Sequence, residues 1–151
     1  MYRYDPSAAS AGPCAVWTLP PTRKVSGRLH RVPLSDAALA LLREAAKLRT
    51  SGAADAFVFP GGKEGKALSS MAMLMLLRRM RRGNLAPGGF RSTFRDWCAE
   101  ATGYPRDVAE AALGYSRQNN AEDEHQQGSL FETRRRLMAE WALICHRSAS
   151  A

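Results

Sequence analysis

Three short blocks in the second half of the chain carry the side chains best suited to chemistry. They contain Arg91 and Arg95 in residues 88–97, Tyr115 in residues 112–116, and His125, ten residues after Tyr115. The planar fork of an arginine can hold two phosphate oxygens at once, which a lysine cannot copy. A phenol can hydrogen-bond a phosphate oxygen, and an imidazole can act as a base or nucleophile near neutral pH.

The composition favours an anionic partner. The 151 residues include 22 Lys and Arg against 14 Asp and Glu, which gives a formal charge of +8. Nucleic acid is the first candidate for such an excess, and a merely soluble basic domain is the alternative. The apolar fraction of 45% is ordinary for a globular protein and excludes a disordered chain.

The cysteines and the hydropathy pattern exclude several other classes. Cys14, Cys98 and Cys145 have no metal-ligand spacing, and Cys98 falls in an amphipathic pattern typical of a buried, reduced thiol. No window approaches the roughly 18 apolar residues that a membrane span requires, and the N-terminus lacks a signal layout. We expect a cytoplasmic protein without a metal, a cofactor or a membrane partner.

The front of the chain predicts a small β-element followed by a helix. Residues 1–13 read as a loose tail, residues 14–147 as one domain, and residues 148–151 as a second tail. Two short strands at 16–19 and 28–34, separated by the turn Lys24–Gly27, predict a β-hairpin. Ser35 is the expected N-cap of a helix whose apolar face carries Ala38, Leu39, Leu41, Leu42, Ala45 and Ala46. Residues 57–60 read as a short buried segment.

The remainder predicts further helices. Ser69 or Ser70 is expected to open a helix that buries one side through Met71, Leu74, Met75 and Leu77. The helix is expected to end in an arginine cluster: Arg78, Arg79, Arg81 and Arg82. For that cluster, phosphate contact and a solvated helix end are the two interpretations. A helix over 90–101 should stop at a C-cap glycine, Gly103, and Pro105 should begin the next. After a short helical piece near 121–127, a last helix over 130–146 is expected to bury Leu137, Trp141, Leu143 and Ile144 and to expose Arg134, Arg135 and Arg136. The predicted fold class is mainly α with a small β-hairpin (α+β).

The three blocks together resemble the C-terminal part of the catalytic domain of tyrosine recombinases, in particular the P4-like prophage integrases. Gly88-Gly89-Phe90-Arg91, Leu113-Gly114-Tyr115 and His125-Gln126-Gln127-Gly128-Ser129-Leu130-Phe131 keep that family's spacing. The family reads His-Gly-Phe-Arg, Leu-Ala/Gly-His and Tyr-Arg-Arg-Gly-Asp-Leu-Phe at these places. The resemblance covers about residues 14–141 and implies a tyrosine-recombinase catalytic-domain fold acting on double-stranded DNA, and hence association with the nucleoid.

Family members join DNA through a tyrosine that attacks the scissile phosphodiester, supported by two arginines, a hairpin lysine and histidine-type donors. By resemblance Arg91 is the second of these arginines. The other positions depart from the family. Gly88 stands at the first histidine position, Tyr115 at the second and His125 at the nucleophile position, and Lys24 lies one residue before the lysine position, which Val25 occupies.

The resemblance therefore implies a degenerate catalytic centre. We expect the first catalytic arginine and the front of the catalytic domain to be absent, so that the fragment is N-terminally truncated. The predicted function is that of a DNA-integration protein that binds DNA but does not cleave it alone, with Arg78, Arg79, Arg81, Arg82 and Arg95 as further DNA contacts. One alternative is an interaction module that pairs with DNA, a full-length recombinase or itself through the C-terminal helix. The other is a strand-transferase that uses His125 with Tyr115.

Overall fold

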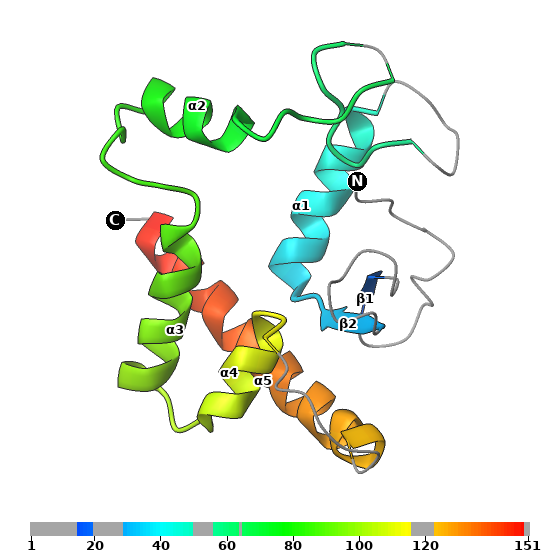
Figure 1. Cartoon of the computed structure of the whole chain (residues 1–151), viewed down its shortest axis with the longest axis vertical. Coiled ribbons are helices and arrows are strands. Elements are labelled where there is room, and N and C mark those ends of the chain that lie inside the picture. Colours follow the sequence, from blue (N-terminus) through cyan, green and yellow to red (C-terminus); the bar gives the residue numbers. More distant parts are fainter. Residues whose placement is uncertain (1–14, 20–28, 50–55, 64, 116–122, 150–151) are drawn as a thin grey trace.

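In the computed structural model of this chain, the described residues are 15–19, 29–49, 56–63, 65–115 and 123–149. This described part is mainly helical, with one two-stranded sheet, as the sequence predicts. The elements are β1 (Val16–Leu19), β2 (His30–Pro33), α1 (Asp36–Lys47), α2 (Ala72–Arg79), α3 (Gly89–Ala101), α4 (Arg106–Ala112) and α5 (Asp123–Ala149). Figure 1 shows α3, α4 and α5 gathered together, the hairpin and α1 beside them, and α2 standing apart beyond α3.

The core lies where α3, α4 and α5 meet. Leu137 of α5 is completely buried there, against Phe94 and Cys98 of α3 and Val108 and Ala109 of α4. Around this centre, Trp141 packs edge-on against Phe94 at 5.4 Å and lies 5.1 Å from Trp97 between ring centroids. Such aromatic pairs stabilise a core beyond the area that they bury. The core thus fixes α3 and α4 relative to each other.

The predicted β-hairpin is confirmed as an antiparallel pair. Trp17 is opposite Val32 and Leu19 is opposite His30, while the turn Lys24–Gly27 lies outside the described residues. The Leu34 N–H extends the pairing by donating to the carbonyl of Ala15 at 2.9 Å. Ser35 then caps α1 as predicted, because its hydroxyl accepts from the Ala38 N–H at 3.3 Å.

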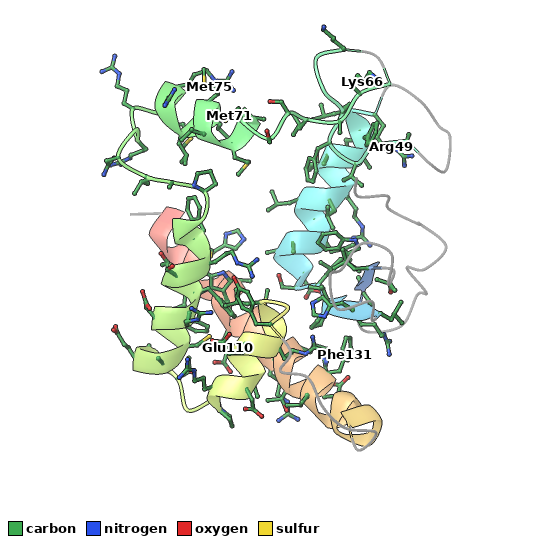
Figure 2. The ribbon with its side chains drawn as sticks, in the orientation of Figure 1. Arg49, Lys66, Met71, Met75, Glu110 and Phe131 are labelled. Atoms are coloured by element: carbon green, nitrogen blue, oxygen red, sulfur yellow. The ribbon has the colours of Figure 1, made fainter. Side chains whose placement is uncertain are left out.

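The prediction that Arg134 is exposed was wrong. Arg134 is only 7% exposed, and its guanidinium donates to the carbonyls of Arg31 in β2 at 3.1 Å and Ala111 in α4 at 3.5 Å. Burial lowers the pKa of Arg134, and the nearby Arg31 charge lowers it further. The guanidinium also lies 5.6 Å from the ring centre of Phe131. Figure 2 labels Phe131 on α5. Arg134 therefore ties the hairpin to α4 and α5.

The expected burial of the α2 methionines was also wrong. Met71 and Met75 are 50% and 46% exposed, Leu74 is half-buried, and only Leu77 of this helix is buried. Their burial needs a neighbouring element, which periodicity alone cannot supply. Three other predicted core residues are exposed for the same reason, namely Leu41, Phe59 and Leu143.

Three helix boundaries differ from the predictions. Met71, not Ser69 or Ser70, is the N-cap of α2, without a side-chain hydrogen bond. Extended Thr102, not a left-handed Gly103, ends α3, and the Thr102 hydroxyl donates to the Cys98 carbonyl at 2.6 Å. The two helical pieces expected after residue 121 are one continuous helix, α5. A glycine inside a helix costs only about 1 kcal/mol, so Gly128 does not interrupt it.

Candidate functional site

The carbonyl end of α4 is built by a glycine turn that positions Tyr115. Gly114 has a left-handed φ of 80°. Its N–H donates to the Ala111 carbonyl at 3.1 Å, and the Tyr115 N–H donates to the Glu110 carbonyl at 2.8 Å. These two bonds form the Schellman pattern, which satisfies the last carbonyls of a helix and favours glycine at the left-handed position. Tyr115 is therefore fixed at its backbone, while half of its surface stays exposed to solvent.

Arg91 reaches this turn from α3. Its Nη2 donates to the carbonyl oxygen of Leu113, the C-cap residue of α4, at 2.6 Å. The guanidinium carbon also lies 4.8 Å from the ring centre of Tyr115, within cation–π range. The hydrogen bond occupies one of the five N–H donors of the arginine, and Arg91 remains exposed. The structure thus brings together two of the residues that the sequence nominates.

Arg95, one turn further along α3, has a different partner. Its Nε lies 3.0 Å from one carboxylate oxygen of Glu110 and its Nη2 lies 3.2 Å from the other. Glu110 was not singled out by the sequence, because it is 15 residues from Arg95 in the chain and on another helix. Arg95 also lies 5.5 Å from the Tyr115 ring centre. Figure 2 shows Glu110 on α4. Its carboxylate compensates the positive charge of Arg95.

Gly88 is the N-cap of α3, three residues before Arg91. It is exposed, its φ of −65° suits any residue, and a Cβ added there would meet no atom within 4 Å. The backbone therefore accepts a larger side chain at this position. Neither conformation nor space therefore requires a glycine at this position.

The remaining nominated positions are only partly described. His125 lies in the first turn of α5, where the structure describes the backbone alone, and Lys24 lies outside the described residues. The site is therefore described without the side chains of His125 and Lys24. Within the described residues, no group of three or more His, Cys, Asp or Glu side chains could hold a metal ion, and no helix could cross a membrane.

The arginine cluster stands at the end of α2. Arg78 and Arg79 occupy its last turn, and all four arginines of the cluster are exposed. Arg81 has a left-handed φ of 57°, which is unusual outside glycine. Its N–H donates to the Arg78 carbonyl and the Arg82 N–H donates to the Leu77 carbonyl, at 3.0 and 2.8 Å. A second Schellman pattern therefore ends α2, with an arginine at the position that favours glycine.

Comparison with known proteins shows that this chain is similar in sequence to two prophage integrases. No family model matches the chain, and no solved structure matches it significantly. Prophage integrase IntA of Escherichia coli (strain K12) is 34% identical over 128 residues, which is 83% of this chain and 30% of the relative. Prophage integrase IntZ of the same strain is 34% identical over 129 residues, 85% of this chain and 31% of the relative. The chain spans about a third of the length of these curated relatives. The two matches support a relationship between this chain and the prophage integrases.

Proposed function

We propose that this chain binds duplex DNA through the face that carries Arg91 and Tyr115, and that it does not break DNA strands by itself. The observation that carries the proposal is the convergence of Arg91, Tyr115 and the C-terminal turn of α4, with the guanidinium fixed by the Leu113 carbonyl. A fixed and exposed guanidinium is preorganised to receive a phosphate. In the resemblance to tyrosine recombinases, Arg91 stands at an arginine that holds the scissile phosphate.

The charge of the chain supports the DNA-binding half of the proposal. The formal charge is +8, and a second exposed basic group, Arg78–Arg82, lies on α2. Each phosphate that a cation neutralises releases counterions, so binding of this kind weakens steeply as salt rises. Non-specific affinities of this type are on the order of 10⁻⁴–10⁻⁶ M at physiological salt.

The loss of reactive groups supports the inactive half. Gly88 has no side chain where the family has a histidine, and His125 stands where the family has its nucleophilic tyrosine. Removal of one preorganised donor typically costs on the order of 10²–10³ in rate. Removal of the nucleophile abolishes a covalent route altogether. Even with Arg91 and Tyr115 in place, these losses leave no efficient path to a phosphotyrosine.

Fluorescence anisotropy with a labelled duplex tests the binding half. The intact chain should bind with an affinity that falls linearly, on logarithmic axes, as the salt concentration rises. Arg91→Ala should weaken binding by about tenfold, the worth of one charge-assisted phosphate contact. Arg136→Ala, which removes an exposed charge from α5, is the matched control. No binding at low salt, or equal losses for Arg91 and Arg136, would contradict the proposal.

A second candidate function is pairing with a full-length recombinase through α5. Leu143 favours it, because this large apolar side chain is 64% exposed on the last helix. Trp141, by contrast, packs within the core of the chain's own α3 and α5 and does not belong to such a surface. Leu143→Gln should weaken co-purification with an integrase if this candidate is correct, and it should leave DNA affinity unchanged.

A further inference from the structure

Helix α2 carries an apolar stripe that the chain does not cover. Met73, Leu76 and Met80 are 52%, 40% and 60% exposed, at positions i, i+3 and i+7. This spacing places the three side chains on one face of the helix end, with Met80 as its C-cap residue. Figure 1 shows α2 away from α3, α4 and α5, and Figure 2 shows Met71 and Met75 on the same isolated helix. Contiguous exposed apolar side chains of this kind mark an interaction surface.

The stripe is bordered by positive charge. The Arg78 Nη1 lies 4.0 Å from the Met75 sulfur, and Arg79 follows Leu76 by three residues on the helix. None of residues 65–95 is acidic, whereas the basic ones are Lys66, Arg78, Arg79, Arg81, Arg82, Arg91 and Arg95. The surface of α2 therefore combines flexible apolar side chains with an uncompensated basic border. Methionine is adaptable enough to fit partners of differing shape.

This combination selects among partners. A second copy of the chain that packed through the same face would bring no carboxylate from residues 65–95 to pair with the arginines. The sugar-phosphate backbone of DNA would engage the arginines but would leave the apolar stripe in water. An amphipathic helix suited to a membrane surface carries its basic residues along the polar face with Trp, Phe or Leu opposite. Here the arginines gather at one end of an eight-residue helix and do not run along a polar face.

We propose that α2 is a docking surface for an amphipathic helix of another protein that carries acidic residues beside an apolar stripe. The partner's apolar side chains cover Met73, Leu76 and Met80, and its carboxylates pair with Arg78 and Arg79. This is recognition of a helix by its apolar face, with charge setting the orientation. The surface does not include Arg91 or Tyr115, so it does not rest on DNA binding by that site. Arg78 and Arg79 pair with the partner's carboxylates only when they do not contact DNA.

A synthetic probe tests the surface. The probe is a fluorescein-labelled peptide of about 18 residues, with leucines at helical spacing and glutamates elsewhere, long enough to form a helix on binding. Two control peptides replace either the glutamates by lysines or the leucines by serines. The intact chain should bind the probe and neither control. Double substitution Met73→Gln with Met80→Gln keeps helix propensity and should weaken binding by about tenfold or more.

Matched variants make the outcome decisive. Arg78→Glu with Arg79→Glu should also weaken probe binding by about tenfold or more. Leu41→Gln, at an exposed apolar residue of α1, should leave probe binding unchanged. The Met73/Met80 variant should keep the affinity of the intact chain for duplex DNA. Its affinity for phosphatidylserine vesicles should also equal that of the intact chain. The proposal is overturned if the probe does not bind or binds the Met73/Met80 variant equally. It is also overturned if that variant loses affinity for DNA or for the vesicles.

Discussion

The Nη2 of Arg91 lies 2.6 Å from the carbonyl oxygen of Leu113, and this bond joins α3 to the end of α4. A helix C-terminus is the negative end of the helix dipole, so a guanidinium placed there is stabilised. The bond holds Arg91 beside Tyr115 before any phosphate arrives. The site is therefore assembled by the fold of α3 and α4.

Arg91 and Arg95 should differ in DNA binding although they lie one turn apart. Arg95 is paired with the half-buried Glu110, whereas Arg91 bonds only a neutral carbonyl among the described hydrogen bonds. Arg91→Ala should therefore weaken duplex binding by about tenfold, and Arg95→Ala by no more than about threefold. Anisotropy titrations at one salt concentration measure both. A larger loss for Arg95 would show that Glu110 does not compensate its charge.

Gly114 should be needed for the α4 turn. Its φ of 80° strains any residue with a Cβ, so Gly114→Ala should lower the free energy of unfolding by about 1–2 kcal/mol. Gly103→Ala is the control, because Gly103 has no positive φ and open space around its Cα. Thermal unfolding of both variants, followed by circular dichroism, makes the comparison. Equal melting temperatures for the two variants would contradict a fixed turn at Tyr115.

Arg81 should separate stability from binding. Glycine relieves the left-handed strain at this position, so Arg81→Gly should leave the free energy of unfolding unchanged or raise it by up to about 1 kcal/mol. The melting temperature should therefore not fall. Loss of an exposed cation from the α2 cluster should at the same time weaken DNA binding and lower its salt dependence. If DNA affinity and its salt slope stay unchanged, the cluster is a solvated helix end rather than a phosphate contact.

Arg134 should be a structural residue. Arg134→Ala removes the hydrogen bonds from the buried guanidinium to the carbonyls of Arg31 and Ala111, which join α5 to β2 and α4, and should lower the free energy of unfolding by about 3 kcal/mol. Arg134→Lys should recover only part of this, because an ammonium cannot reproduce the fork of the guanidinium. The exposed neighbour Arg136→Ala should change stability by no more than about 0.5 kcal/mol. Urea unfolding measures the free energy of unfolding of the three variants, which should be lowest for Arg134→Ala and highest for Arg136→Ala. Equal free energies for Arg134→Ala and Arg136→Ala would refute a structural role of Arg134.

Local patterns predicted the elements of this fold better than its burial. The hairpin and the Ser35 cap follow from strand alternation and helix capping, and each is confirmed. Leu77 and Met73 have the same apolar character, and the sequence cannot say that only Leu77 finds a neighbour. Arg134 shows the reverse error, since its carbonyl partners lie as far as 103 residues away in the chain.

The candidate site divides in the same way. Arg91 and Tyr115 were nominated by family spacing, and the structure places them in contact. The Leu113 carbonyl and Glu110 were missed, because a main-chain acceptor has no sequence signature and the Arg95–Glu110 pair spans two helices. The roles of Gly88, His125 and Lys24 stay predictions, as do the DNA contacts of the arginine cluster.

The central claim is DNA binding without strand breakage. The most direct measurement incubates the chain with a nicked suicide duplex that carries a candidate attachment site, and divides the sample between a native and a denaturing gel. A full-length prophage integrase on its own site is the positive control, and the reversion Val25→Lys, Gly88→His, Tyr115→His, His125→Tyr is run beside it. The account predicts a shifted complex on the native gel and no protein–DNA adduct on the denaturing gel. An adduct that disappears in His125→Ala or Tyr115→Phe would contradict it and would identify those residues as an active centre.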